Sequence, residues 1–149
     1  MTTRQPKGIP VGGQFAQERK PDGDDLATPT PSMTTDYRGT KRWYRNGVLH
    51  RDDGPAVEWP DGAKEWYRNG VLHRDGGPAG EYFGGTKMWY RNGLRHRNGG
   101  PAVEGIDGYR AWYRNGKRHR DDGPAVELAN GTKEWYHDGV RVQPPKETT

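Results

Sequence analysis

The chain has 149 residues, a net charge of only +4, and 29% hydrophobic residues, against about 45–50% in ordinary globular chains. This composition excludes a conventional aliphatic core, and the absence of cysteine excludes disulfides, thiolate metal sites and cysteine nucleophiles. The apolar content is aromatic instead, with six Trp and eight Tyr, while 23 Gly and 12 Pro indicate many turns. No apolar run approaches the about 18 residues that span a bilayer.

Residues 1–36 are predicted to form a disordered or extended arm, because Pro and charged residues are frequent there and apolar residues show no period. Its apolar part contains Ile9, Val11 and Phe15, which form either part of a linker or a peptide that docks on a protein partner. The start of the chain lacks the hydrophobic segment of a secretory signal, so we expect a protein of the host cytoplasm or one associated with a virion.

From about Gly39 to Gln143, a unit of 23 residues recurs five times and predicts a β domain over residues 37–143, followed by a tail over 144–149. Four units read Trp-Tyr-Arg-Asn-Gly, then His-Arg, then Gly-Pro-Ala and Glu, whereas the fifth is partial and reads His137-Asp138-Gly139. A register without insertions indicates a stacked array. The recurring structural positions are Trp43, Trp66, Trp89, Trp112, Trp135, His50, His73, His96, His119, Asn46, Gly47, Asn69, Gly70, Asn92, Gly93, Asn115 and Gly116.

Asn-Gly between alternating residues is a strong signal for a hairpin with a two-residue turn, since a type I′ turn needs positive φ at both central residues. The Trp–His pair that this turn creates recurs in four units, whereas the Glu–Arg pair beyond it does not recur. The pairs expected in the second unit are Arg68 with Val71, Tyr67 with Leu72, Trp66 with His73 and Glu65 with Arg74.

A second turn is expected between units, centred on two residues such as Asp61-Gly62. It gives the sheet one face with Trp, His and Val and another with Tyr, Leu and Glu. Gly-Pro is predicted to bend the chain, because Pro cannot donate to a ladder. The fold class is therefore all-β, a largely single-layer antiparallel meander of about nine or ten strands, with Arg stems covering the rings. The expected pairs are Val57 with Trp66, Gly80 with Trp89, Val103 with Trp112 and Val126 with Trp135.

The unit, written KEWYRNGVLHRDGGPA over residues 64–79, resembles MORN repeats, and more closely the MORN-variant repeats of bacterial, phage and giant-virus proteins. The resemblance covers residues 39–143 and implies a sheet of hairpins in a phage or bacterial accessory protein; some relatives are labelled antitoxin-like. Standard MORN units have Gly where this chain has His-Arg, and they lack Gly-Pro-Ala. No polybasic tail or amphipathic helix supports lipid binding, so no membrane partner is expected.

The recurring His residues are interpreted as structural. Equivalent positions in neighbouring units would lie about 10 Å apart, whereas zinc needs nitrogen atoms about 2.0–2.1 Å from one ion, so neither a shared metal site nor a cofactor is expected. A His–Asp pair such as His50 with Asp52 or Asp53 is not kept in the third unit, which has Asn98-Gly99. No nucleophile elbow, P-loop or dinucleotide fingerprint occurs, so the chain is predicted not to be an enzyme.

A nucleic-acid-binding protein is one alternative, because Arg side chains interleaved with aromatic rings suit single strands, whose bases stack on rings. Every unit also carries Asp and Glu, which are expected to pair with the Arg side chains. The basic and aromatic positions concerned are Arg45, Arg68, Arg91, Arg114, Arg51, Arg74, Arg97, Arg120, Tyr44, Tyr67, Tyr90 and Tyr113.

A scaffold for protein–protein interaction is the favoured interpretation, since repeat sheets present the same side chains at regular intervals and Trp, Tyr and Arg are enriched in interface hot spots. An antitoxin-like partner of a toxin is a further alternative. Specificity is expected where the repeat is broken, near the turns between units. The residues concerned are Trp59, Tyr82, Phe83, Ile106, Tyr109 and Leu128, together with Ile9, Val11 and Phe15 of the arm.

Overall fold

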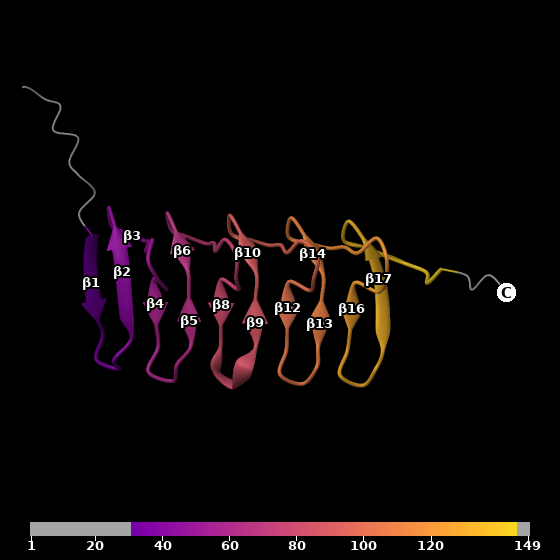
Figure 1. The fold of residues 1–149 in the computed structure, drawn as a ribbon, viewed down its shortest axis with the longest axis horizontal. Coiled ribbons are helices and arrows are strands. Elements are labelled where there is room, and N and C mark those ends of the chain that lie inside the picture. Colours follow the sequence, from indigo (N-terminus) through magenta and orange to yellow (C-terminus); the bar gives the residue numbers. More distant parts are fainter. Residues whose placement is uncertain (1–30, 146–149) are drawn as a thin grey trace, which may run out of the picture.

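In the computed structural model, which describes residues 31–145, the units lie side by side along the long axis as one open antiparallel meander (Figure 1). The expected all-β class built from tandem hairpins is confirmed. The one helical element in these residues is the 3₁₀ turn η1 (Phe83–Gly85). No helix that is long and apolar enough to cross a membrane occurs within residues 31–145.

The main sheet has twelve strands, and its strand order follows the chain. It begins earlier than the boundary expected at residue 37, because Pro31–Thr35 pairs along its whole length with the first Trp-bearing strand. The strands of the main sheet are β1 (Pro31–Thr35), β2 (Lys41–Arg45), β3 (Val48–Leu49), β4 (Val57–Glu58), β5 (Lys64–Glu65), β8 (Gly80–Glu81), β9 (Lys87–Met88), β12 (Val103–Glu104), β13 (Arg110–Ala111), β16 (Val126–Glu127), β17 (Lys133–His137) and β18 (Val140–Val142).

Three Asn-Gly hairpins form separate two-stranded ribbons, which lie along the upper edge of the main sheet in the view of Figure 1. The backbone N–H of Gly70 donates to the carbonyl of Leu49 at 2.8 Å, so the ribbon of one unit is bonded to the hairpin of the unit before it. Equivalent bonds recur along the array. The ribbons are β6 (Tyr67–Arg68) with β7 (Val71–Leu72), β10 (Tyr90–Arg91) with β11 (Leu94–Arg95), and β14 (Tyr113–Arg114) with β15 (Lys117–Arg118).

The Asn-Gly turns have the predicted geometry. Asn69 has φ of 51° and Gly70 has φ of 80°, as a type I′ turn requires. Tyr67 pairs with Leu72, and the N–H of His73 donates to the carbonyl of the Trp in the same unit at 3.0 Å. The predicted register of this hairpin is therefore confirmed up to the Trp–His pair.

The turns between units differ from the expectation because they are three-residue loops. The N–H of Trp59 donates to the carbonyl of Ala63 at 3.0 Å, which leaves Pro60, Asp61 and Gly62 in the loop. The Asp61 carboxylate accepts the N–H of Ala63 at 2.9 Å, and Gly62 has φ of 89°. An Asp that accepts this N–H and a Gly with positive φ stabilise the longer loop.

The longer loop shifts the pairing by one residue, so the expected faces are corrected. Val57 lies opposite Glu65 and not opposite Trp66. Because side chains alternate with a period of two, Val moves to the face of the Tyr residues and Glu58 moves to the face of the Trp residues. We call these the Tyr face and the Trp face. The corresponding corrected pairs are Gly80 with Met88, Val103 with Ala111 and Val126 with Glu134.

One cluster of apolar packing lies on the Tyr face. Val103, Ala111 and Val126 are buried and form a cluster. Burial of apolar surface stabilises the fold by roughly 25 cal/mol per Å², and the half-buried rings extend this burial along the array. The side chains packed against the cluster are Met88, Tyr109, Tyr113, Leu128 and Tyr136.

Candidate functional site

On the Trp face, an Arg side chain folds over the Trp ring in each of the first four units. Cζ of Arg51 lies 4.1 Å from the ring centroid of Trp43. The guanidinium donates to the carbonyl of Pro55 and to the Glu58 carboxylate, each at 3.2 Å. At Gly54 a Cβ would lie 3.0 Å from Cζ of Arg51, so a larger residue there would crowd this fold-back. The Gly-Pro-Ala motif and its Glu therefore hold the Arg over the ring.

The other three stacks are built in the same way, with Cζ to ring distances of 3.8, 3.8 and 4.2 Å. The expected pair of Glu65 with Arg74 is therefore wrong. Arg74 leaves the strand, lies over Trp66 and pairs with Glu81 at 3.1 Å. The remaining stacks are Arg97 over Trp89 and Arg120 over Trp112.

Charged side chains of opposite sign also alternate across the Trp face of the main sheet. Each basic residue of this row lies directly opposite a Glu on the neighbouring strand. Cross-strand pairs of opposite charge contribute roughly 0.2–1 kcal/mol each. The row runs Lys41, Glu58, Lys64, Glu81, Lys87, Glu104, Arg110, Glu127 and Lys133.

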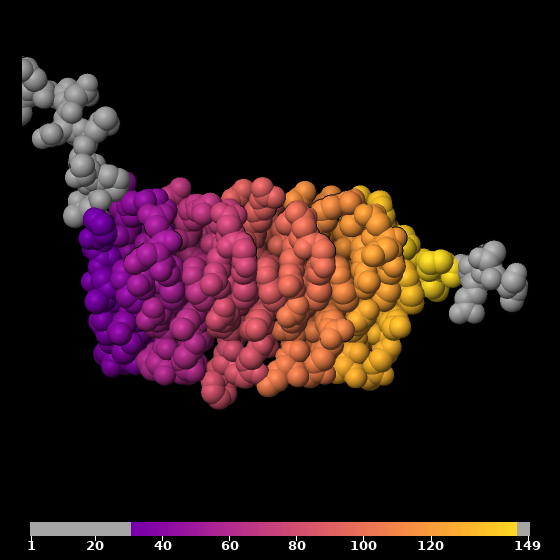
Figure 2. Space-filling view, viewed as in Figure 1, coloured from indigo at the N-terminus to yellow at the C-terminus, as the bar shows by residue number. Residues whose placement is uncertain are grey.

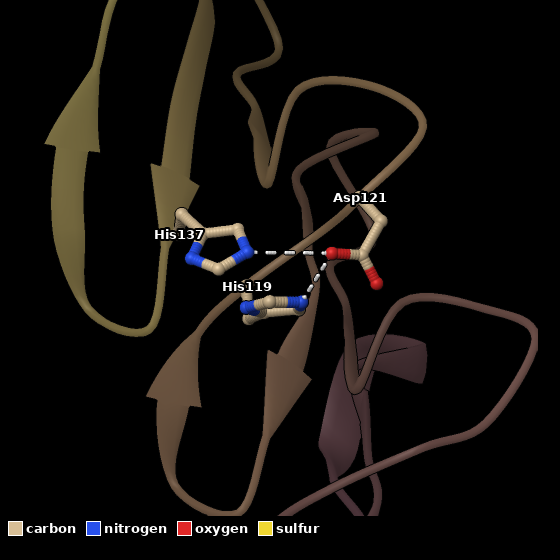
Figure 3. Close-up of side chains that lie close together, drawn as sticks. All are labelled: His119, Asp121 and His137. Atoms are coloured by element: carbon tan, nitrogen blue, oxygen red, sulfur yellow. Dashed lines mark hydrogen bonds and ion pairs between the residues drawn. The ribbon is translucent and has the colours of Figure 1, made fainter.

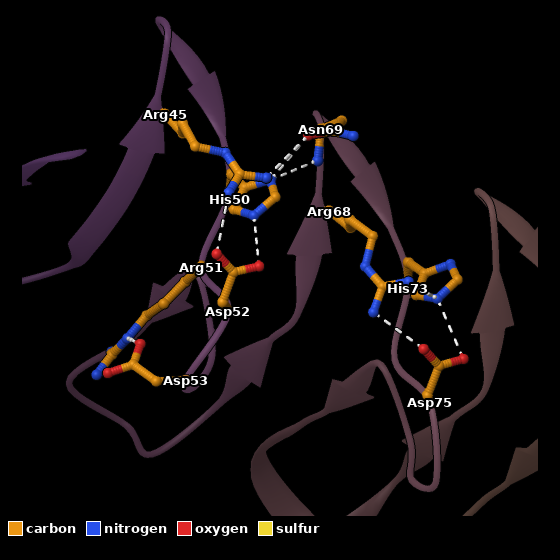
Figure 4. A network of polar contacts seen from close by, with 9 residues as sticks. All are labelled: Arg45, His50, Arg51, Asp52, Asp53, Arg68, Asn69, His73 and Asp75. Carbon is orange, nitrogen blue, oxygen red and sulfur yellow. Dashed lines mark hydrogen bonds and ion pairs between the residues drawn. The ribbon is translucent and has the colours of Figure 1, made fainter. Parts of the chain in front are cut away.

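The recurring His residues connect one unit to the next (Figure 4). His50 is buried, and its Nδ1 accepts the backbone N–H of Asn69 in the following unit at 3.0 Å. Nε2 of His50 faces Oδ1 of Asp52 at 2.9 Å, and this hydrogen bond holds the pKa of Asp52 below its usual range. The equivalent bonds run from Asn92 to His73, from Asn115 to His96 and from Asp138 to His119, at 3.1, 3.2 and 3.1 Å.

The Arg residues of the Arg-Asn-Gly turns are held by carboxylates of the same unit. Arg45 pairs with Asp52 at 3.0 Å, Arg68 with Asp75 at 2.9 Å, and the fourth unit repeats the pair at 3.3 Å. Arg68 first, and then the neighbouring His, lowers the pKa of Asp75. In the third unit Asn98 stands in place of this Asp, and Arg91 has no ion pair within residues 31–145.

The predicted ladder of Arg and Tyr is divided between the two faces, because consecutive strand residues such as Tyr67 and Arg68 point to opposite sides. On the Tyr face the rings meet other Arg side chains. Arg95 donates to the hydroxyl groups of Tyr90 and Tyr113 at 3.3 and 3.4 Å. A cleft of about 480 Å³ between the first two units is lined by Trp66, Tyr67, Arg68, His73, Asp52 and Asp53.

Two of the residues predicted to bind a partner protrude from the turns between units. Phe83 is 78% exposed and Ile106 is 74% exposed, and a Cβ at Gly84 would lie 3.7 Å from Cδ1 of Ile106. Tyr37, which the sequence analysis did not single out, is 90% exposed at the first turn. We call this side of the sheet the turn edge, defined by the first loop residue of each turn: Tyr37, Pro60, Phe83, Ile106 and Ala129.

The other predicted partner-binding residues lie half-buried on the Tyr face. Tyr109 and Leu128 pack against the apolar cluster. Trp59 is half-buried beside its turn. Tyr82 covers Gly80, where a Cβ would lie 2.7 Å from the ring, and its hydroxyl donates to Glu65 at 2.8 Å.

These contacts give part of the broken repeat a packing role. Burial first, and then the hydrogen bond to Glu65, raises the pKa of Tyr82. Gly80 stands where the other complete units have Val, and the ring of Tyr82 occupies the space that a larger side chain at residue 80 would need. Ile9, Val11 and Phe15 of the arm lie outside the described residues.

The fifth unit brings together a group that the sequence analysis missed. His137 occupies the place of the turn Arg, and its ring centroid lies 4.5 Å from that of His119 in the fourth unit (Figure 3). The signal was present in the sequence as a replacement of Arg by His. It was missed because only His residues at equivalent positions were considered together.

Comparison of the chain with family models, curated proteins and solved structures finds no match. The fold and these surfaces place the chain in the general class of open β-hairpin repeat sheets.

Proposed function

We propose that the chain is a non-enzymatic repeat scaffold that binds another protein through the turn edge. The supporting observation is the exposure of Tyr37, Phe83 and Ile106 along one side of the sheet. Exposed apolar side chains that gather in one place mark interaction surfaces, and aromatic residues are enriched in interface hot spots. We propose that the arm with Ile9, Val11 and Phe15 is a second segment that binds the partner.

The spacing of the turns indicates what kind of partner fits. Each unit adds two strands, so successive turns advance by about 10 Å. The turn that contains Phe83 projects beyond its neighbours (Figure 2). A partner with an extended or regularly spaced surface can contact several turns at once, which strengthens binding without a deep pocket.

The Trp face is less suited to nucleic acid. Its Arg side chains other than Arg91 already pair with carboxylates, and each basic residue of the row on the main sheet lies opposite a Glu. Binding to phosphates depends on basic groups that are free to release counterions. The single-strand-binding alternative therefore requires breaking ion pairs that stabilise the sheet.

The resemblance to MORN-variant repeats suggests the setting. On that basis, the proposed role is that of a phage or bacterial accessory protein, either associated with a virion or acting on a host or toxin protein. An antitoxin-like role is one form of this proposal, with the toxin as the protein partner. The proposed location is the host cytoplasm or the virion.

The test is capture of the partner from the cells in which the protein occurs. We expect the double variant Phe83→Ser/Ile106→Ser to lose at least about 90% of a partner captured by the wild type, since loss of two exposed hot-spot residues costs more than about 1.4 kcal/mol. The matched control is Val48→Ser/Val71→Ser, which changes exposed residues at the Asn-Gly turns on the opposite side.

Retention of the same partner by the Phe83/Ile106 variant, with loss in the control, would contradict the proposal. Titration with single-stranded DNA and RNA at about 50 mM salt tests the other function. If the chain binds single-stranded DNA or RNA tightly and in a salt-dependent way, and captures no protein, the nucleic-acid-binding function would be favoured over the scaffold.

A further inference from the structure

In its hairpin turn, the fifth unit differs from the others at two neighbouring positions, and both face the same His of the fourth unit. His137 and Asp138 stand where the other units have Arg and Asn. The ring of His137 meets that of His119 at 4.5 Å between centroids, with an angle of 56° between the planes. Asp138 donates its backbone N–H to Nδ1 of His119 at 3.1 Å. The two replacements therefore change one local environment together.

Three ligand atoms converge at this point (Figure 3). Oδ1 of Asp121 lies 2.9 Å from Nε2 of His119 and 3.5 Å from Nε2 of His137. All the ligand atoms lie within 4.8 Å of one another. A tetrahedral zinc ion with bonds of about 2.0–2.1 Å holds its ligand atoms about 3.3 Å apart, so the side chains need only small shifts to bind one ion.

The second nitrogen of His119 also has a suitable partner. Its Nδ1 lies 3.0 Å from Oδ1 of Asp138. When Nε2 of a His binds a metal, the proton resides on Nδ1, so Nδ1 of His119 would donate to the Asp138 carboxylate in place of accepting the backbone N–H of Asp138. A carboxylate that accepts this proton orients the ring and raises its basicity. In the first unit the same place is taken by the Oδ1 of Asn69, a neutral amide, at 2.9 Å from His50. Asp138 supplies the charge that the amide lacks.

The replacement of Arg by His137 also removes a permanent cation from the place where a metal ion would lie. One cation remains nearby, because Arg114 pairs with Oδ2 of Asp121 at 3.3 Å and with Oδ1 of Asp138 at 3.2 Å. These contacts leave Oδ1 of Asp121 directed toward the two His rings. The charge of Arg114 will reduce the affinity for a cation, and the two carboxylates offset it.

Burial of the three side chains differs in a way that suits a site at the surface. The side chain of His119 is only 4% exposed, whereas those of Asp121 and His137 are 68% and 57% exposed. The buried ring gives the site one fixed ligand. The exposed side leaves a position for water or for a donor atom from another molecule.

We propose that His119, Asp121 and His137 bind a divalent transition-metal ion of the zinc type, with Asp138 as the partner of His119. Two imidazoles and one carboxylate favour zinc over calcium or magnesium, which prefer sets of oxygen atoms. The sequence argument against a shared ion applied only to His residues at equivalent positions of neighbouring units. These two rings come from different positions of successive units, so the ion would link the fourth unit to the fifth.

The experiment is calorimetric titration of the full metal-free chain with zinc chloride. We expect one zinc ion per chain and a higher melting temperature with zinc, since an ion that binds only the folded state stabilises it. Cobalt chloride gives a second readout, because a cobalt ion in a His-containing tetrahedral site absorbs visible light. All five His residues of the chain lie in the repeats, so variants can assign the signal.

His137→Arg restores the residue of the other units and is expected to fold, yet to lose zinc binding by about 100-fold or more, because it replaces a ligand by a cation. Asp138→Asn should weaken binding about 10- to 100-fold. His96→Gln, in the third unit, is the matched control and should bind as the wild type does. Absence of zinc binding by the wild type, or equal binding by the His137→Arg variant, would overturn the proposal.

Discussion

The Trp face and the turn edge belong to the same sheet, but their side chains are used differently. On the Trp face, a guanidinium covers the ring in each of the first four units and is held there by a Pro carbonyl and a Glu. On the turn edge, Phe83 and Ile106 project into solvent and share little with other side chains. Residues that depend on one another recur without change, whereas a loop tip can vary freely and is available for a partner.

The fifth unit also bears on this difference between the recurring framework of the Trp face and the variable turn edge, because it changes residues of the framework. His137 and Asp138 break the repeat on the Trp face, where breaks are otherwise rare, and they do so around one His of the preceding unit. A break at a place that normally contributes to the framework is more informative than a break at a loop tip. The zinc titration therefore tests this end of the array separately from the turn edge.

The largest expected effect is the loss of a stacked ring. Trp66→Ala removes a half-buried indole that lies under Arg74, and large-to-small changes of this kind cost about 3 kcal/mol or more in the free energy of unfolding. Denaturation by urea, followed by far-UV circular dichroism, measures it. Phe83→Ala on the turn edge is the control and should stay within about 0.5 kcal/mol of the wild type. Equal destabilisation by both changes would remove the difference between the two regions.

A smaller effect is expected when the cation over the ring is changed but kept. Arg74→Lys retains the charge and loses the planar group that stacks on Trp66 while bonding Pro78 and Glu81. We expect a loss of about 1 kcal/mol in the same denaturation experiment. Arg91→Lys, where the structure shows no ion pair within residues 31–145, should have no measurable effect. An unchanged free energy of unfolding in Arg74→Lys would mean that the stacking of the guanidinium on Trp66 contributes little to stability.

The smallest effect concerns the first turn in acid. Asp36 accepts a hydrogen bond from Arg42 at 2.8 Å, and this bond foremost lowers the pKa of Asp36 to about 2. Because the pKa of an unfolded Asp is about 3.9, this stabilisation is present above about pH 4 and is lost as the pH falls toward about 2. We expect the melting temperature of Asp36→Asn to fall less over this range than that of the wild type.

The matched control for this turn is Asp107→Asn. Asp107 caps a later turn by accepting the N–H of Tyr109 at 3.0 Å, and no guanidinium pairs with it in residues 31–145. The melting temperature of this variant should follow the acid dependence of the wild type. If the melting temperature of Asp36→Asn falls with pH as steeply as that of the wild type, the pairing of Asp36 with Arg42 does not influence stability in acid.

The features that could be predicted are those that a few adjacent residues determine. The period and the Asn-Gly turns define the hairpins, since Asn69 and Gly70 tolerate positive φ and a two-residue turn leaves one register. Arg covering the Trp rings was also expected, from the proximity of Arg and aromatic residues in each unit. The exposure of Phe83 and Ile106 agrees with their position at loop tips.

The register between units could not be predicted in the same way. Pro60-Asp61-Gly62 is compatible with either a two- or a three-residue loop, and the choice depends on a side-chain bond from Asp61 and on packing of Val57 against the Tyr face. A shift of one residue in the pairing of two strands moves the side chains of one strand to the opposite face relative to its partner. This is why the assignment of Val and Glu to the two faces was wrong while the strands themselves were right.

By itself, the sequence determined that the chain is a stack of β-hairpins with Trp and His in register, because turn residues with restricted dihedral angles act over two to four positions. Only the tertiary structure decided which residues of different units meet. Arg74 reaches Glu81, and His137 reaches His119, through the placement of one unit against another. Contacts of that kind depend on loop length and packing across the array, which no single unit specifies.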